Sequence, residues 1–524
     1  MEHYDVTVVG AGLGGVAAAL QAAREGCSVL VVEHTDLVGG QLVAAGVTSV
    51  DEYYMDGRYG IYREFRDRVR TWYQRLGRSA ATCYWSTNTV ACEPQVAQRV
   101  LLDMLSEAGV ELELGATVTD VLRQGARVTG AALSSGRVVS SKVTVDASED
   151  GYLLPIAGAR YRLGNRLSPD LDPDARLQDF TWTILIKEYP DGVPGHLRLP
   201  APPPGYSWES FRRVQLETPF PRNVYAPVIG FRSVVDYRGC PDPASATPHR
   251  TTKTSVNVNY VNDVPQVARY FLDPQHRFEM DLRMRLRSLQ FLYYVQDHLG
   301  LPWSVCPDAG YDRSAYNLQQ LERCVAALPE LAPFRQVLAH FPPAPYVREC
   351  RRVVGRATLT CDDVWAQREF PDAAALNGYP VDIHGATKPH DVEADLDTAF
   401  TTLRDAHKEH PAKQFQVPLG AFVPQGLEGL LVCEKNLSQS RLANGATRVH
   451  SSVMINGQAV GKLAAELVRR GAPPVSDQIL VEVAAAALKM CSGSAGLPTT
   501  NKVEEERKGL LPPGQPPTCA ARST

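Results

Sequence analysis

The sequence lacks the features of several specialised classes of protein. Its 11 cysteines include no C-x-x-C pair, which argues against an iron–sulfur cluster or a redox-active disulfide. No apolar run reaches the length of about 18 residues that a transmembrane helix needs. The 54 basic and 58 acidic residues are interspersed and leave a net charge of −4. We therefore expect no nucleic acid and no membrane as partner, and we expect no metal site.

We expect no signal peptide, because an apolar segment typical of a buried strand begins within the first residues. Without export, the scattered cysteines are expected to be reduced thiols, and a cytoplasmic location is predicted. A length of 524 residues, 44% of them hydrophobic, is enough for a large core. It allows roughly two to four domains.

The most informative stretch is the first forty residues. Residues 6–9 form an apolar run that predicts a buried parallel strand, and this run leads into Gly10, Gly12 and Gly15. The small side chains of residues 16–25 then predict a helix that packs closely on a sheet, and a second apolar strand follows. A strand, a glycine-rich turn, a helix and a second strand in this order are typical of a dinucleotide-binding fold.

The glycines and one acidic residue have defined roles in such a fold. Gly10 permits a tight turn, Gly12 lets the backbone approach a pyrophosphate, and Gly15 lets the helix pack against the strand. The pyrophosphate lies at the helix N-terminus, where free N–H groups and the helix dipole favour an anion. Glu33 ends the second strand, where it can accept hydrogen bonds from ribose hydroxyls and would repel a 2′-phosphate, so NADP is disfavoured. The alternative is a glycine turn that binds no nucleotide.

A Gly39-Gly40 pair follows shortly after Glu33. It resembles the FAD-binding signature of the glutathione-reductase-like flavoproteins, in which this turn lies along the pyrophosphate and the flavin ring. More distant blocks resemble the bacterial FAD-dependent oxidoreductases, and the resemblance extends roughly from residue 4 to residue 470. These blocks are residues 39–42, 93–94, 146–148, 346–355, 378–385 and 448–459.

The resemblance implies an α/β fold, with a Rossmann-like FAD-binding domain of parallel sheet and β-meander and an inserted α+β substrate domain. The expected divisions are residues 1–160 for the first part of the FAD-binding domain, 161–411 for the substrate domain, 412–473 for the returning part, and 474–524 for a C-terminal helix and a tail predicted to be disordered. A helix is expected to begin at Gly457 and to direct its N-terminus at the pyrimidine edge of the flavin.

The same resemblance implies which residues hold FAD. The backbone near Val118 is expected against the adenine, and Ala147 belongs to a second nucleotide-contact turn. The full set is Gly10, Gly12, Leu13, Gly14, Gly15, Glu33, His34, Gly39, Gly40, Gln41, Val118, Ala147, Gly457, Gln458 and Ala459.

The leading hypothesis for the reaction is a dehydrogenase or oxidase. A C–H bond of a small-molecule substrate donates hydride to flavin N5 while a base accepts a proton, and oxygen or another acceptor reoxidises the flavin. A base with a pKa of about 6.5 suits this chemistry, and His450 and His384 are the candidates. The alternative for each histidine is a hydrogen bond to FAD or to the backbone.

Two arginines are candidates for binding the substrate, Arg448 and Arg348. Arg348 lies in a basic cluster that could bind a carboxylate or a phosphate. The alternative for this cluster, which we favour, is an internal ion-pair network that joins domains.

Two other functions remain open. One is a flavin monooxygenase or halogenase-like enzyme, to which residues 180–184 (Phe-Thr-Trp-Thr-Ile) give only a faint similarity. The other is a catalytically silent subunit that has kept the FAD-binding fold. The sequence does not name the substrate or the oligomeric state.

Overall fold

The structure is a computed structural model, and it describes residues 1–53, 56–77, 90–212, 214, 252–386, 388–395, 400–411 and 413–492. The predicted disordered tail, from residue 493 on, lies outside the described residues.

In the described residues, the main sheet contains seven strands, and most of them are segments that the sequence predicts. In spatial order they are β3 (Glu111–Leu114), β2 (Val29–Glu33), β1 (Glu2–Val9), β6 (Val138–Asp146), β5 (Arg127–Leu133) and β4 (Val118–Gln124), with β16 (Leu430–Val432) also paired to β6. The β3-β2-β1-β6-β16 pairings are parallel, whereas β4, β5 and β6 form an antiparallel meander. The predicted Rossmann-like sheet with a β-meander is confirmed.

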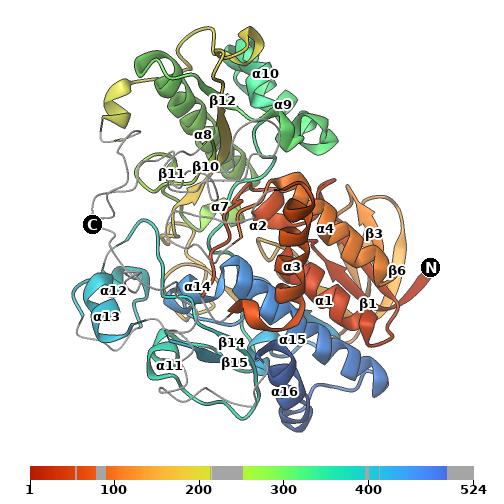
Figure 1. The fold of residues 1–524 in the computed structure, drawn as a ribbon. Coiled ribbons are helices and arrows are strands. Elements are labelled where there is room, and N and C mark those ends of the chain that lie inside the picture. The colour runs from red at the N-terminus through yellow and green to blue at the C-terminus, as the bar shows by residue number, and fades with distance from the viewer. Residues whose placement is uncertain are drawn as a thin grey trace.

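Helices surround this sheet and continue into a second lobe, which carries α8, α9 and α10 at the top of Figure 1. The α-helices of the described residues are α1 (Leu13–Arg24), α2 (Gly40–Val43), α3 (Gly60–Arg75), α4 (Pro94–Glu107), α5 (Leu153–Ile156), α7 (Arg269–Leu272), α8 (Pro274–Tyr293), α9 (Ala315–Ala327), α10 (Arg335–Leu338), α11 (Cys361–Ala366), α12 (Pro389–Val392), α13 (Leu403–Glu409), α14 (Arg441–Thr447), α15 (His450–Arg469) and α16 (Asp477–Ser492). In that part of the chain, none of them is both long and apolar enough to cross a bilayer.

Helix α15 corrects one prediction, because it begins at His450 and not at Gly457. Gly457 lies inside the helix, where α15 crosses α1. A Cβ at Gly457 would overlap the carbonyl oxygen of Gly14 and would lie 2.8 Å from its Cα. The glycine is therefore needed for the close approach of two helix backbones, which a sequence pattern does not distinguish from the start of a helix.

We expect Gly457→Ala to destabilise the protein, because the added methyl group has no space between α15 and α1. Overpacking of this kind costs about 1–3 kcal/mol, which urea unfolding would measure as a lower midpoint. Gly195→Ala is the matched control, since a Cβ at Gly195 meets no atom within 4 Å. Equal midpoints for the two variants would show that the helices do not need a glycine at this crossing.

A second hydrophobic core is built from residues between Leu163 and Cys350. It contains an antiparallel sheet of β10 (Lys253–Val256), β9 (Ile184–Glu188) and β12 (Trp303–Val305), against which α8 and α9 bury apolar side chains. Most buried apolar side chains from Val353 onward belong to the first core instead, whereas Ala373, Leu376 and Leu488 form a small separate cluster. The proposed end of the substrate domain at residue 411 stays a prediction.

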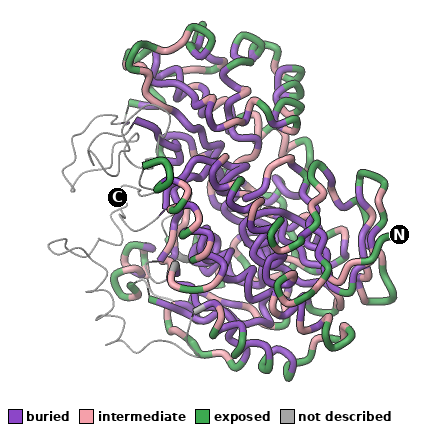
Figure 2. The backbone as a smooth tube through the Cα atoms, turned by 45° about the vertical axis from the view of Figure 1, so that its right-hand side comes forward, coloured by how far each residue is buried: buried purple, intermediate pink, exposed green. Residues whose placement is uncertain are grey.

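Buried chain runs through the middle of the molecule, as the purple tube in Figure 2 shows, and short antiparallel strand pairs lie outside the two larger sheets. The pairs are β8 (Phe180–Thr181) with β11 (Asp263–Val264), β7 (Tyr161–Arg162) with β13 (Arg352–Val353), and β14 (Ala373–Asn377) with β15 (Phe415–Pro418). The segments that carry the candidate catalytic residues lie in this region.

Candidate active site

The glycine-rich turn between β1 and α1 has the geometry of a dinucleotide cradle. A Cβ at Gly15 would overlap the carbonyl oxygen of Gly10, so α1 approaches β1 as closely as the motif requires. Glu33 lies at the end of β2 and accepts hydrogen bonds from Ala11 N (2.8 Å) and Thr35 N (3.0 Å). Burial alone would raise the pKa of Glu33, but the charge and hydrogen bond of His34, together with these N–H groups, lower it. The carboxylate is therefore ionised where a ribose is expected.

The Gly39-Gly40 turn packs directly on this cradle. Gly39 N donates to Ala11 O at 2.8 Å, and a Cβ at Gly40 would lie 2.8 Å from Gly12 Cα. Gln41, the next residue, is in α2 and is buried. The predicted cofactor residues of the first forty positions are thus brought together in one place.

Two acidic side chains occupy the space between these turns. Gly14 N donates to Glu434 Oε1 and Gln41 N donates to Glu149 Oε1, each at 2.8 Å. A Cβ at Gly12 would lie 2.9 Å from the Glu434 oxygen and 3.2 Å from the Glu149 oxygen. The backbone therefore fits a dinucleotide, whereas two side chains fill the space that its diphosphate needs.

The other predicted nucleotide contacts lie beside the cradle. Val118 is at the start of β4, and its N–H donates to the hydroxyl of Tyr152 at 3.2 Å. Ala147 follows β6, donates to Val9 O at 2.8 Å, and lies with its carbonyl group against Gly10. Both residues are thus next to the region where the nucleotide is expected.

Gly457, Gln458 and Ala459 lie within α15, away from its N-terminus. Gln458 accepts from Ile61 N at 2.9 Å and donates to Gln21 Oε1 at 3.0 Å, and so links α15 to α3 and α1. These three residues were assigned to the cofactor because a helix was expected to begin at Gly457. In the structure this helix begins at His450.

His450 is the first residue of α15 and is fully buried. Its Nδ1 accepts a hydrogen bond from Asp51 N (3.2 Å), which leaves Nε2 to donate to Val47 O (2.9 Å). Both ring nitrogens therefore have backbone partners. This geometry favours the backbone role that was the alternative for His450.

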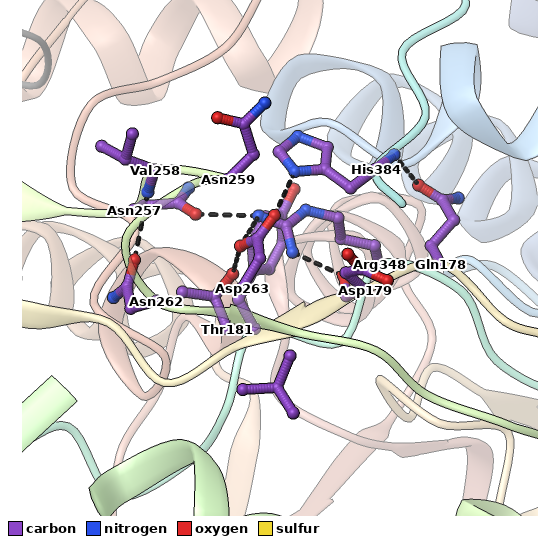
Figure 3. Close-up of polar contacts among 12 residues, drawn as sticks. Gln178, Asp179, Thr181, Asn257, Val258, Asn259, Asn262, Asp263, Arg348 and His384 are labelled. Atoms are coloured by element: carbon purple, nitrogen blue, oxygen red, sulfur yellow. Dashed lines mark hydrogen bonds and ion pairs between the residues drawn. The ribbon is translucent and has the colours of Figure 1, made fainter. Parts of the chain in front are cut away.

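His384 has a different environment, in which its ring contacts the carboxylate of Asp263 (Figure 3). Its Nδ1 lies 2.5 Å from Asp263 Oδ2, and its Nε2 lies 3.6 Å from Asp382 Oδ2. The imidazole is 19% exposed, whereas Asp263 is buried. Burial and the charge of Arg348 lower the pKa of His384, but the two carboxylates outweigh them and raise it. His384 is therefore held in its protonated form above the usual pH range of a histidine.

Arg348 is fully buried in the same cluster, and its guanidinium contacts groups of the protein. It donates to Asp263 Oδ1 (3.1 Å), Asn257 Oδ1 (2.8 Å) and Asp179 O (2.6 Å). Although burial would raise the pKa of Asp263, Arg348 and His384 lower it to about 2. These contacts favour the internal ion-pair network that was the alternative for Arg348.

Arg448 connects the histidine cluster to the cradle. Its guanidinium lies 2.9 Å from Asp382 Oδ2 and 2.6 Å from the hydroxyl of Tyr346, and its carbonyl accepts from Gln41 Nε2 at 3.2 Å. Its Nε is buried and has no hydrogen-bond partner among the described residues. A chain of direct contacts thus runs from the Gly39-Gly40 turn to His384.

Sequence reasoning did not identify the two carboxylates beside His384. Asp382 lies in the block 378–385 that the resemblance singled out, so this block was a signal for it. Asp263 had no such signal, because it is 121 residues away from His384 in the chain and lies on β11, which pairs with β8.

The chain is similar to several known proteins. The family described as "FAD dependent oxidoreductase" matches residues 5–488. FixC of Salmonella typhimurium is 29% identical over 167 residues, and the vinyl phenol reductase of Lactiplantibacillus plantarum is 28% identical over 191 residues. Each alignment covers 29% of this chain and 38% of the relative, so the chain spans about two fifths of the length of these proteins.

Among solved structures, a geranylgeranyl bacteriochlorophyll reductase-like protein from Thermoplasma acidophilum aligns with 97% of this chain and 84% of its own. The identity is 11% and the TM-score is 0.35. The match over residues 5–488 shows the identity of the chain at the level of its family. The chain belongs to the family of FAD-dependent oxidoreductases, enzymes whose cofactor is FAD.

Proposed function

We propose that this protein is a dehydrogenase or oxidase that removes a hydride from a small-molecule substrate while His384 accepts a proton. FAD, when bound, takes up the hydride. The observation that carries the proposal is the Asp263–His384–Asp382 arrangement, which direct contacts through Arg448 link to the Gly39-Gly40 turn.

Asp263 is the positioning residue of this arrangement. Its buried carboxylate accepts from Nδ1 of His384, which fixes the orientation of the ring and leaves Nε2 as the atom that accepts a proton. A hydroxyl or amine of the substrate would give its proton to Nε2. The imidazolium that forms is stabilised by Asp263 on one side and Asp382 on the other.

Arg448 and Tyr346 would hold the polar end of the substrate. The guanidinium and the phenol lie 2.6 Å apart, beside the half-exposed carboxylate of Asp382. The unpartnered Nε–H of Arg448 is a further donor in this place. An anionic or hydroxyl-bearing substrate suits these donors.

The raised pKa of His384 favours a second candidate, reduction of the substrate. In that direction the imidazolium donates its proton from Nε2 while a hydride is delivered to the substrate. One of the relatives is named a reductase, which agrees with this direction. The two candidates use the same residues and differ in the sign of the pH dependence.

An anaerobic screen tests both candidates. Alcohols, amines and sugars are mixed with the FAD-loaded protein, and loss of flavin absorbance reports oxidation of the substrate. Phenolic and unsaturated compounds are then mixed with protein reduced by dithionite, and recovery of absorbance reports reduction. In a separate aerobic assay, consumption of NAD(P)H coupled to oxygen would contradict the proposal and favour a monooxygenase. The absence of turnover with every donor and acceptor would favour a silent subunit.

A further inference from the structure

Two fully buried arginines, Arg352 and Arg441, lie close to each other and to the buried carboxylate of Glu349. Arg441 is the first residue of α14, and its Nε donates to Glu349 Oε2 at 2.6 Å. Arg352 is in β13, where burial and the charge of Arg441 lower its pKa, although the charge of Glu349 acts against this. Like charges are thus packed together in the interior, which is unfavourable unless anions compensate them.

The guanidinium groups of this pair have more donors than the protein satisfies. Arg441 Nη1 and Nη2 are buried and have no acceptor among the described residues, and the same is true of Arg352 Nε and Nη1. Arg352 Nη2 donates to the carbonyl oxygen of Gly164. A buried N–H group without an acceptor is unfavourable, so these four nitrogens require an acceptor that the described side chains do not supply.

Asn444 adds a donor on the same face of α14. It lies three residues after Arg441, so the two side chains are neighbours on the helix surface. Its Oδ1 accepts from Gln178 Nε2 at 3.1 Å, which leaves its buried Nδ2 as a donor with no acceptor in the described part of the chain. Gln178 N donates to Glu349 Oε2 at 3.1 Å, so Asn444 is linked to the same carboxylate as Arg441.

The charges of this region also favour an anion. A third buried arginine, Arg162, pairs with Arg352 across β7 and β13, and its Nη1 donates to a carbonyl and a hydroxyl oxygen. Two buried carboxyl groups act on Arg352, those of Glu349 and Glu393. Burial raises the pKa of Glu393, which disfavours its ionised form. The three arginines therefore carry at least one positive charge more than the two carboxyl groups.

The balance of donors and acceptors distinguishes an anion from a water molecule. The unpartnered donors are five nitrogens, two each of Arg441 and Arg352 and one of Asn444, and the unpartnered acceptor beside them is Glu349 Oε1. A buried water molecule donates as well as accepts, so it needs acceptors around it. An ion that only accepts hydrogen bonds suits this set of groups better. Because the groups are closed to solvent, the ion must be small.

We propose that Arg352, Arg441 and Asn444 bind a small monovalent anion of the halide class, such as chloride, in the interior of the protein. The anion neutralises the excess positive charge and accepts from the unpartnered N–H groups. Through Gln178, whose Oε1 accepts from His384 N at 3.4 Å, the site is connected to the main chain of His384. The proposal does not rest on the proposed reaction, because it is argued from the contacts of the anion site alone.

Thermal unfolding of the FAD-loaded full chain tests the anion site. The protein is exchanged into sodium gluconate and titrated with sodium chloride or sodium bromide at constant ionic strength. Either halide should raise the unfolding midpoint until the effect saturates, because it binds the folded state alone. Gluconate should not, because it is too large for a closed site. Equal midpoints in halide and gluconate at every concentration would overturn the proposal.

Asn444→Asp replaces the halide by an internal anion. The aspartate keeps an oxygen for Gln178 and places a second oxygen where Nδ2 was a donor. This variant should be at least as stable in gluconate as the wild-type protein, and chloride should no longer raise its midpoint.

Asn317→Asp is the matched control, since the Nδ2 of buried Asn317 donates to three carbonyl oxygens. This control should be destabilised in both salts and keep the response to chloride. If Asn444→Asp behaves in the same way as Asn317→Asp, no anion is bound beside Asn444. Crystals grown in bromide locate the ion directly. An anomalous peak beside the Nη atoms of Arg441 is expected, and bromide peaks confined to the molecular surface would overturn the proposal.

Discussion

Replacement of His384 by glutamine is expected to lower the rate of flavin reduction by the substrate about 10²–10⁴-fold. Glutamine can keep the hydrogen bond to Asp263 but cannot accept a proton, so the hydride transfer loses its coupled proton acceptor. The FAD content should stay at the wild-type level, because the contacts of His384 are to Asp263 and Asp382, outside the cradle. Anaerobic stopped-flow measurement on the FAD-loaded protein gives both quantities.

The pH dependence of the same rate gives the direction of the reaction. Because the carboxylates raise the pKa of His384, the neutral imidazole becomes abundant only above about pH 6.5. If His384 is the base, the rate of substrate oxidation rises with pH through its pKa. If it is the acid of a reductase, the rate of substrate reduction falls with pH through the same value. This rise or fall of the rate with pH, here called the pH limb, should be missing in His384→Gln.

His450→Gln is the control for this prediction. His450 contacts the backbone through both ring nitrogens, so its replacement should lower the stability and leave the pH limb intact. A wild-type rate in His384→Gln, together with loss of the limb in His450→Gln, would assign the base to His450 instead.

Lys253→Met is expected to destabilise the protein by about 3–5 kcal/mol. Lys253 is 1% exposed, and its ammonium lies 2.6 Å from Glu93 Oε1 and 2.5 Å from Asp308 Oδ2. Glu93 precedes α4 of the first core, whereas Lys253 is in β10 of the second. Methionine fills a similar volume but removes the cation that pairs with the buried carboxylate of Glu93, and it leaves Asp308 with Lys187 alone, 3.5 Å away. Urea unfolding would measure the loss.

The loss of folding stability in Lys253→Met should depend on pH. The pKa of Glu93 is already raised to about 7 by its burial, and removal of Lys253 raises it further. A carboxyl group whose pKa is higher in the folded state takes up a proton on folding, so it favours the folded state at low pH. The variant should therefore lose stability as the pH rises through about 7, and its deficit should be smaller at pH 5 than at pH 8.

Lys142→Met provides the exposed counterpart. Lys142 pairs with Asp5 at 2.7 Å, but its side chain is 54% exposed. Exposed pairs contribute about 0–1 kcal/mol, so this variant should unfold close to the wild-type midpoint. Similar losses in the two lysine variants would mean that the Lys253 cluster is not a special link between the cores.

The part of the fold that local patterns specify could be predicted from the sequence. The apolar run before Gly10 and the run that ends at Glu33 are both strands of the parallel sheet, since each is buried on both faces. The start of α15 could not be predicted in the same way. The sequence does not distinguish a glycine at a helix crossing from a glycine at a helix end. The close contact of Gly457 with Gly14 shows that it lies at a crossing.

The candidate site shows the same division. The Gly39-Gly40 turn lies close in the chain to the motif of Gly10, Gly12 and Gly15. Its position beside this motif could therefore be predicted. Asp263 and Glu434 could not, because each reaches its partner through pairing of distant segments. A single carboxylate carries no pattern of its own. Its role depends on which residue the tertiary fold places beside it.

The late position of β16 in the chain has a consequence for synthesis on the ribosome. This strand pairs with residues 144–146 of β6, and α15, which follows it, packs on α1. Nearly 300 residues must be translated after β6 before either surface is covered. The emerging N-terminal part therefore exposes an apolar helix face and an unpaired strand end throughout that interval. Such surfaces promote aggregation, so the nascent chain should depend on chaperones until α15 has left the exit tunnel.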